Sequence, residues 1–329
     1  MTRELIINGY EIKPGEKRRI LINIAKLPSH SSINISINVS RGKEDGPTLL
    51  LMGGLHGDEI NGVEIVRRMI ETDLHAPLRG SVICIPILNI YGFIHFSRYL
   101  PDGKDVNRSF PGNKNGSLAS RLAHYVTHNI IPQIDYGVDF HTGGGERTNF
   151  PQVRCVFADP ENEKLAEAFH APFTLNSPYR AHSLRQTAGK LGKKILVYEG
   201  GESVRFDEFA IVQGIEGARR LMKHLDMIDD APHPLVKNTI IRNSSWVRAK
   251  VSGMFTSSVE SGQQVKRNQL LGYITDTFGD YKKPVKSPAA GYVIGLNNNP
   301  LVHQGDAIMH LGVTKSGPMN IHGDDTVGT

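Results

Sequence analysis

The sequence predicts an α/β domain followed by a small all-β domain. Between Thr48 and Leu225, continuous apolar segments typical of buried strands alternate with segments of helical periodicity, as in a sheet covered by helices on both faces. After residues 231–234, Ala-Pro-His-Pro, short strand-like segments are separated by glycines, which indicates a β module. We therefore expect an α/β domain over residues 1–234 and a β domain over residues 235–329.

The first 47 residues are expected to form a β entry (1–47) to the α/β domain. Residues 32–40 alternate polar and apolar side chains with a period of two, which is typical of a half-buried strand, and residues 41–47 have the composition of a turn. A buried strand over 48–54 and a helix over 63–70 follow. The remaining strands of this domain are expected at 82–88, 136–141, 152–158 and 195–199, with helices at 117–131, 161–170 and 207–225.

The β domain shows a weak internal repeat. Residues 252–255, Ser-Gly-Met-Phe, and 290–293, Ala-Gly-Tyr-Val, resemble the half-repeats of biotinyl- and lipoyl-carrying barrels. No lysine stands in the context that would carry such a prosthetic group, so the pattern predicts a barrel-like shape and not a carrier function. Its strands are expected at 246–250, 254–256, 270–275, 291–295 and 307–312, with a frayed tail after residue 313.

Composition excludes several classes of function. The 329-residue chain has a net charge of +5 and no dense basic run with interleaved aromatics, so we expect no nucleic-acid partner. The sequence has no run of about 18 apolar residues and no signal peptide, which predicts a cytoplasmic protein without a membrane partner. Cys84 and Cys155 lie in apolar segments and are expected to be buried thiols. A homo-oligomer is compatible with the sequence.

Three polar residues at the ends of predicted strands suggest a metal site. His56 and Glu59 follow the strand over 48–54, and His141 ends the strand over 136–141. Imidazole nitrogens and a carboxylate suit Zn²⁺, and three protein ligands leave a fourth position for water, as in a catalytic zinc site. The sequence therefore predicts one zinc ion per chain, bound by these three residues.

Glu199 ends another apolar strand, and a carboxylate in that position must be paired, bound to a metal or catalytic because burying a lone charge is costly. Ligands of open α/β sheets gather at the carboxyl ends of strands, where His56 and His141 are also expected. Beside a zinc-bound water, Glu199 would act as the general base and pass the proton to the leaving amine. A structural ion pair is the alternative, and Glu202 is the neighbouring competitor for the role.

Arginines between and after these strands offer contacts to an anionic substrate. Arg108 can clamp a carboxylate and Asn107 can donate to it, while Arg98 could stabilise the oxyanion of a tetrahedral intermediate. Asp105 could hold Asn107 or Arg108, or a metal-binding histidine, in place. Arg147 could add a second anion contact. The alternative is a surface salt bridge for Arg108 and a surface loop position without a ligand for Arg147.

These motifs together resemble the succinylglutamate desuccinylase/aspartoacylase family, a branch of the zinc carboxypeptidase-like (M14) superfamily. The matching segments are 54–59 (Gly-Leu-His-Gly-Asp-Glu), 105–112 (Asp-Val-Asn-Arg-Ser-Phe-Pro-Gly), 139–141 (Asp-Phe-His) and 198–200 (Tyr-Glu-Gly). The resemblance implies a zinc-carboxypeptidase-like mixed sheet and a C-terminal β domain that partly covers the active site. It also implies the metal, base and substrate roles given above, with Arg98 at the scissile carbonyl and Tyr281 as a substrate contact from the β domain.

The sequence thus predicts a zinc-dependent amidohydrolase that cleaves the amide bond of an N-acyl amino acid. The alternative within this class is trimming of glutamate or other amino acids from a peptide or protein tail. The alternative from another class is a non-catalytic binding protein on the same fold. The expected partner is a small acyl-amino acid or an acidic peptide.

Overall fold

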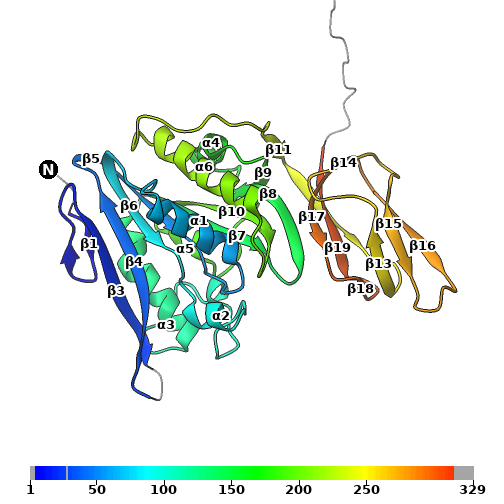
Figure 1. The fold of residues 1–329 in the computed structure, drawn as a ribbon, viewed down its shortest axis with the longest axis horizontal. Coiled ribbons are helices and arrows are strands. Elements are labelled where there is room, and N and C mark those ends of the chain that lie inside the picture. The colour runs from blue at the N-terminus through cyan, green and yellow to red at the C-terminus, as the bar shows by residue number, and fades with distance from the viewer. Residues whose placement is uncertain (1–3, 27–28, 315–329) are drawn as a thin grey trace, which may run out of the picture.

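The computed structural model describes residues 4–26 and 29–314, and it has a large α/β lobe and a smaller all-β lobe (Figure 1). Among these residues, thirteen strands form one sheet that runs through both lobes. Its main path, in spatial order, is β12 (Asn243–Arg248), β19 (Ala307–Val313), β17 (Gly291–Asn297), β8 (Arg147–Cys155), β10 (Lys194–Glu202), β7 (Tyr136–Gly143), β5 (Glu44–Met52), β6 (Arg79–Ile85), β4 (Ser32–Arg41) and β3 (Lys17–Lys26).

The remaining strands are short or belong to other sheets. β9 (Phe173–Asn176), β11 (Thr239–Ile241) and β14 (Gln264–Val265) join the large sheet off its main path, and β1 (Ile6–Ile7) pairs with β2 (Tyr10–Glu11). A four-stranded sheet in the smaller lobe consists of β16 (Lys282–Lys286), β15 (Leu270–Thr275), β13 (Gly253–Ser257) and β18 (Leu301–Val302).

Helices cover both faces of the central strands because successive strand residues point to opposite faces. Leu49 and Leu51 of β5 pack in one core with α1 (Ile60–Glu71), α4 (Pro160–Phe169) and α6 (Glu208–His224). Leu50 and Met52 pack in the other with α3 (Leu118–Tyr125) and α5 (Leu184–Lys190). The other helical segments are α2 (Ile90–Ile94), η1 (Val106–Arg108), η2 (Val126–Ile130) and η3 (Ile131–Gln133). No helix of the described ranges is long and apolar enough to span a membrane.

The register of the central strands places the predicted site residues side by side. β6, β5, β7 and β10 are parallel neighbours, so their carboxyl ends lie along one edge of the sheet. Glu199 on β10 is the register partner of His141 on β7, and Met52 at the end of β5 is the partner of Asp139. The loop that follows β5 therefore emerges beside the end of β7.

The smaller lobe continues the large sheet across the predicted domain boundary. β17 pairs with the start of β8, where Asn297 is the partner of Arg147, and β19 and β12 follow. The two sheets of this lobe enclose their own core, which includes Phe255, Leu271 and Leu311. The all-β character after residue 234 is as expected, while the division into domains at 234 and 235 stays a prediction.

The α/β architecture with a mixed sheet and an all-β C-terminal region confirms the predicted fold class, and several boundaries differ. The expected turn at 41–47 is shorter because β5 already begins at Glu44, with an irregular register before Thr48 that accommodates Pro47. The helix expected at 117–131 is α-helical only to Tyr125 and continues as a π turn. The predicted tail lies outside the described residues from 315 onward.

Both cysteines are buried as expected, and burial raises the pKa of the Cys155 thiol to about 12.

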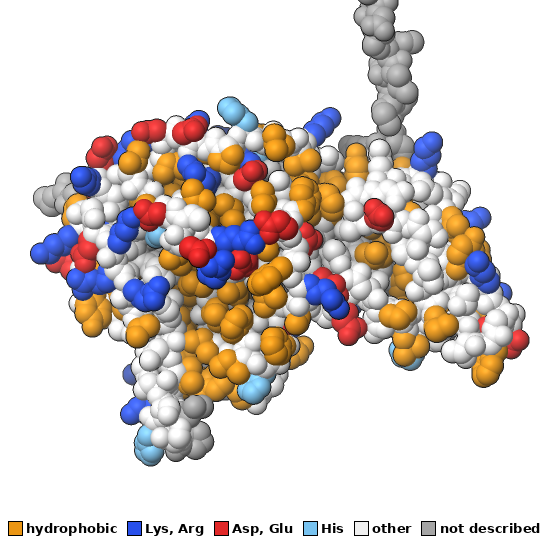
Figure 2. All heavy atoms as spheres, viewed as in Figure 1, with side chains coloured by type: hydrophobic (Ala, Val, Ile, Leu, Met, Phe, Trp, Pro, Cys, Tyr) orange, Lys and Arg blue, Asp and Glu red, His pale blue; other side chains and the backbone are white. Residues whose placement is uncertain are grey.

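An ion-pair network joins α1 to α6. Glu64 accepts hydrogen bonds from Arg67 and Arg68, and Arg68 also pairs with Glu208 of α6. Acidic and basic side chains intermingle over these helices in Figure 2. The hydrogen bonds from Arg67, followed by those from Arg68 against the opposing effect of burial, lower the pKa of Glu64 from 4.5 to about 2.

We expect Glu64→Gln to lower the free energy of unfolding by about 1–2 kcal/mol at pH 7 and by almost nothing near pH 2. The folded-state pKa is depressed, so the contribution is present above about pH 4.5 and is lost as the pH falls toward 2. Urea unfolding at both pH values measures it. Glu71→Gln, which removes an exposed partner of Arg67, is the matched control and should cost less than about 0.5 kcal/mol. An equal loss for Glu64→Gln at both pH values would contradict this assignment.

Candidate active site

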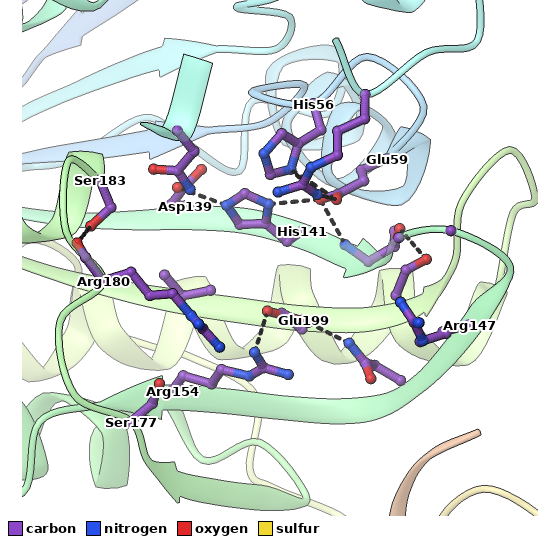
Figure 3. A pocket seen from close by; sticks show the side chains of 18 of the residues that line it. His56, Glu59, Asp139, His141, Arg147, Arg154, Ser177, Arg180, Ser183 and Glu199 are labelled. Carbon is purple, nitrogen blue, oxygen red and sulfur yellow. Dashed lines mark hydrogen bonds and ion pairs between the residues drawn. The ribbon is translucent and has the colours of Figure 1, made fainter. Parts of the chain in front are cut away.

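A cavity of about 530 Å³ opens at the carboxyl ends of β5, β7 and β10 and extends toward the smaller lobe (Figure 3). Its size is typical of a small-molecule site. It is the place where the sequence-predicted residues meet, with one exception described below. The predicted residues that line it are His56, Glu59, Arg98, Asn107, Arg108, His141, Arg147 and Glu199.

The three predicted metal ligands converge on one point. One ligand atom each from His56, Glu59 and His141 lie within 4.8 Å of one another, and all three residues are buried. Nδ1 of His56 is 2.8 Å from Oε1 of Glu59, and Nδ1 of His141 is 2.6 Å from Oε2. The loop carrying His56 packs tightly, since a Cβ on Gly57 would lie 1.9 Å from the carbonyl carbon of Gly92. Glycine is therefore required there to bring His56 to the site.

Each histidine has a carboxylate behind it. Nε2 of His141 is 2.8 Å from Oδ2 of Asp139, and Nε2 of His56 is 3.2 Å from Oδ1 of Asp105. A hydrogen on each Nε2 satisfies these contacts and leaves the Nδ1 lone pairs facing the oxygens of Glu59. Acceptors that face each other at such distances need a proton or a metal cation between them. Carboxylates behind metal-binding histidines fix the tautomer and the ring orientation in this way.

The charges around His56, Glu59 and His141 also favour a positive charge between these three side chains. Burial by itself lowers the pKa of His56, but the charge of Glu59 and the hydrogen bond to Asp105 outweigh it and raise that pKa. For His141, burial is opposed by Asp139 and Glu59, and the pKa is held well above its ordinary value. Burial would raise the pKa of Glu59, yet the two histidines hold it well below its usual range. The set of two nitrogens and one carboxylate therefore fits a divalent cation.

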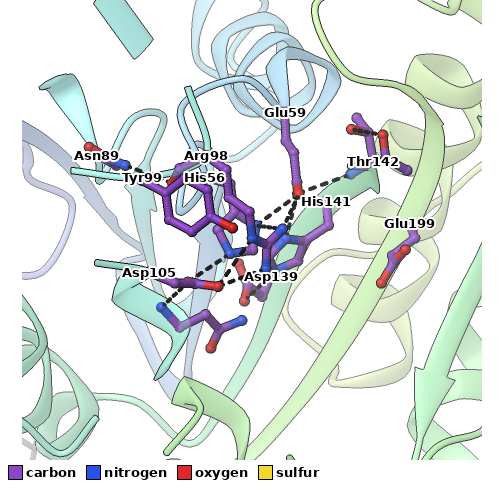
Figure 4. Close-up of polar contacts among 12 residues, drawn as sticks. His56, Glu59, Asn89, Arg98, Tyr99, Asp105, Asp139, His141, Thr142 and Glu199 are labelled. Atoms are coloured by element: carbon purple, nitrogen blue, oxygen red, sulfur yellow. Dashed lines mark hydrogen bonds and ion pairs between the residues drawn. The ribbon is translucent and has the colours of Figure 1, made fainter. Parts of the chain in front are cut away.

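Arg98 lies at the edge of this cluster (Figure 4). Its Nη1 is 3.1 Å from both Nδ1 of His56 and Oε1 of Glu59. The positively charged guanidinium therefore lies beside the lone pairs of this nitrogen and this oxygen. Its Nε and Nη2 donate to Oδ2 of Asp105 at 3.1 and 2.9 Å. Asp105 thus holds His56, which is one of the alternatives that the sequence left open, and it also holds Arg98, which is not one of them.

Glu199 faces the same cavity from β10 and is tied to β8. Its Oε1 is 2.9 Å from Nη1 of Arg154, and its Oε2 accepts a hydrogen bond from the side-chain amide of Asn149. Only about 14% of the Glu199 side chain is exposed. Glu199 therefore forms the ion pair that was the predicted alternative, and it also lines the cavity, while its role as the general base stays a prediction. The two partners orient the carboxylate without removing it from the cavity.

Asn107 and Arg108 come from η1, on the side of the cavity where α5 begins. Oδ1 of Asn107 accepts a hydrogen bond from the backbone N–H of Leu184 at 3.0 Å, so its amide NH₂ remains as the available donor. Arg108 is exposed, and its Nη1 donates to the carbonyl of Asn107 at 2.6 Å. This leaves most of its guanidinium donors for a ligand.

Tyr281 is the predicted site residue that the structure does not bring to the cavity. It precedes β16 and its hydroxyl donates to the backbone carbonyl of Ser252. β16 pairs with β15 in the separate four-stranded sheet, which turns this hairpin away from β17 and β8. The aromatic residue that lines the cavity from the smaller lobe is Trp246 of β12.

Several cavity residues were not assigned from the sequence. The contact of Asp139 with His141 could have been predicted from the sequence. Residues two apart on a strand share a face, and Asp139 is two residues before His141. The places of Arg154 and Trp246 could not have been predicted in this way, since they depend on which strands pair. Arg180 lies in the loop before α5 and also lines the cavity.

The chain is similar to known proteins in its sequence and in its fold. The family model described as the succinylglutamate desuccinylase/aspartoacylase catalytic domain matches residues 45–225. The N-alpha-acetyl-L-2,4-diaminobutyric acid deacetylase of Halomonas elongata is 28% identical over 286 residues, which cover 82% of either chain.

Solved structures extend the similarity to the fold of nearly the whole chain. The product-bound ectoine utilization protein EutE (DoeB) from Ruegeria pomeroyi superposes with a TM-score of 0.80 at 23% identity, covering 91% of this chain and 95% of that one. A succinylglutamate desuccinylase/aspartoacylase from Rhodobacter sphaeroides gives 0.79 at 24% identity, covering 90% and 95%. Because the family model spans more than half of the sequence, the chain belongs to the succinylglutamate desuccinylase/aspartoacylase family of deacylases.

Proposed function

We propose that this protein is a zinc-dependent hydrolase that cleaves the amide bond of an N-acyl amino acid. The observation that carries the proposal is the convergence of two carboxylate-backed imidazoles on Glu59, with Glu199 in register beside His141. An acyl-amino acid is favoured as the substrate class because the Halomonas elongata relative is named as a deacetylase of such a compound.

His56, Glu59 and His141 would hold the metal, with Asp105 and Asp139 fixing the two imidazoles. When bound, zinc supplies Lewis-acid polarisation of the amide carbonyl and lowers the pKa of a coordinated water. The mixed nitrogen and oxygen donors fit this ion better than a cation such as Mg²⁺, which prefers oxygen ligands.

Glu199 would take a proton from the attacking water and give it to the departing amine nitrogen. Arg154 and Asn149 keep its carboxylate pointed into the cavity, so little reorganisation is needed when the substrate arrives. Arg98, fixed by Asp105, would donate to the carbonyl oxygen as negative charge develops there. Asn107 and Arg108 would hold the substrate carboxylate and thereby set which amide bond lies beside Glu199.

We expect Glu199→Gln to retain one zinc per chain and to lose kcat by about 10²–10⁴-fold on the best N-acyl amino acid, because only proton transfer is removed. Metal analysis and steady-state kinetics measure both. Glu202→Gln is the matched control on the same strand, since the Glu202 side chain lies 3.5 Å from Nε of Arg205 and does not line the cavity. If the Glu199 variant kept its activity while the Glu202 variant lost it, the base would be reassigned. A wild-type protein with zinc and no turnover would favour a binding function.

We expect Asp139→Asn to weaken zinc binding by about 10–100-fold, because the amide no longer accepts the proton of His141 with full charge. Competition with a chelator of known affinity measures the effect. Asp102→Asn, which changes an exposed aspartate in the segment before η1, is the control and should leave affinity unchanged. Identical zinc affinity in the two variants would show that Asp139 does not support a metal ligand.

A further inference from the structure

We propose that Asn149 is a positioning residue for the Glu199 carboxylate, and that a β-bulge at Phe150 and Pro151, held by the smaller lobe, brings it there. The inference rests on the proposed function, in which Glu199 is the general base, and it extends that function to the smaller lobe. Arg154 is the second side chain that holds the same carboxylate.

The first argument is the spacing of the two side chains that hold Glu199. Asn149 donates a hydrogen bond to its Oε2, and Nη1 of Arg154 is 2.9 Å from its Oε1. Both residues belong to β8, and they are five positions apart. Side chains an odd number of positions apart point to opposite faces of a regular strand. The two side chains meet at one carboxylate because β8 is irregular between them.

The register of the large sheet places this irregularity at residues 150–151. Gln152 is the partner of Glu199 on β10, whereas Asn149 is the partner of Gly201, so two residues of β8 lie opposite one residue of β10. This is the pattern of a β-bulge, which re-aims the side chains beyond it. A proline fits a bulge because it has no N–H to donate to the ladder. Without the extra residue, Asn149 would point away from Glu199.

The bulge also lies where β8 changes one of its neighbours. Before the bulge, residues 147–149 pair with β17 of the smaller lobe, and after it residues 152–155 pair with β9. β10 pairs with both parts from the other side. Figure 1 shows β8 leading from the α/β lobe toward the smaller lobe. The smaller lobe therefore holds the part of β8 that carries Asn149.

The smaller lobe also leaves space for the Asn149 side chain. The register partner of Asn149 on β17 is Gly295, and a Cβ on this glycine would lie 2.8 Å from Oδ1 of Asn149. A side chain at this position would therefore push the carboxamide away from Glu199. Beyond the bulge, the buried side chain of Gln152 donates to the carbonyl of Ile294 at 3.1 Å. β17 thus contacts β8 on both sides of the bulge.

Phe150 anchors the bulge itself. The centre of its ring lies 5.5 Å from that of Phe173 on β9 and 5.6 Å from that of Phe209 on α6. From the smaller lobe, Gly262 lies directly against the same ring, since a Cβ on this glycine would overlap it. These contacts on several sides oppose rotation of the bulge and hence movement of Asn149.

The first test asks whether Asn149 acts through its amide donor. Asn149→Ala and Asn149→Asp both remove the donor, and the aspartate keeps the shape of the side chain but places a second carboxylate beside Glu199. We expect kcat on the best N-acyl amino acid to fall about 10- to 100-fold in the alanine variant and further in the aspartate variant. KM and zinc content of the alanine variant should change less than about twofold, because neither substrate binding nor the metal ligands are altered.

Asn243→Asp is the matched control for this test. Asn243 is an exposed asparagine at the start of β12, and the same substitution there should leave kcat unchanged. If Asn149→Asp were as active as the wild type, only the shape of the side chain would matter, and the inference would be overturned.

The second test displaces Phe150 from the smaller lobe. Gly262→Ala should lower kcat about fivefold or more and speed hydrogen exchange of the backbone amides of residues 147–150, because the added Cβ overlaps the Phe150 ring. Gly305→Ala is the matched control. Its φ of +96° is close to the +88° of Gly262, and no described atom lies within 4 Å of the added Cβ. Equal kcat and equal exchange in the two variants would refute the role of the smaller lobe.

A double-mutant cycle tests the contact of Asn149 with Glu199 without relying on hydrolysis. Urea unfolding at one zinc concentration gives the equilibrium constants of the wild type, Asn149→Ala, Glu199→Ala and the double variant. We expect the effect of the double variant to differ about fivefold or more from the product of the two single effects, because the side chains interact. Agreement within about twofold would reject the contact.

The outcomes separate a failure of this inference from a failure of the proposed function. If the wild type hydrolysed no substrate, the proposed function would fail, and the double-mutant cycle and the hydrogen exchange would still decide whether the bulge positions Asn149 against Glu199.

Discussion

The parallel alignment of β5, β7 and β10 is the constraint on which the site depends. Because Glu199 is the register partner of His141, and the loop after β5 emerges beside β7, one edge of the sheet gathers two imidazoles and two carboxylates. A shift of one residue in any of these strands would turn its side chain to the opposite face. The helices on both faces fix the alignment through buried residues that alternate along β5.

Burying the charged side chains of this site without partners would cost free energy. In the structure each of them has a partner of opposite charge or a hydrogen-bond partner. Asp105 and Asp139 stand behind the histidines, Arg98 is held by Asp105, and Arg154 and Asn149 hold Glu199. Paired groups keep one orientation, which is what pre-organised catalysis requires.

The smaller lobe belongs to the site because the sheet does not stop at the edge of the α/β lobe. β8 carries Arg147, Asn149 and Arg154 and pairs with β10 on one side and with β17 on the other. The same strand thus connects the general-base candidate to the lobe that carries Trp246. Backbone hydrogen bonds therefore connect the strand that carries Glu199 to the smaller lobe through β8.

The alternation of buried strands and helices, the change to β structure after residue 234, and the polar residues at or just after the carboxyl-terminal parts of β5, β7 and β10 could be predicted from the sequence. These features depend on the periodicity of apolar and polar residues within short segments of the sequence. Three contacts became visible only in the folded chain: Arg154 and Asn149 hold Glu199, Trp246 and not Tyr281 lines the cavity, and Arg98 shares Asp105 with His56. Those contacts join residues on strands and loops far apart in the chain, and sequence spacing carries no information on which strands pair or how a hairpin turns.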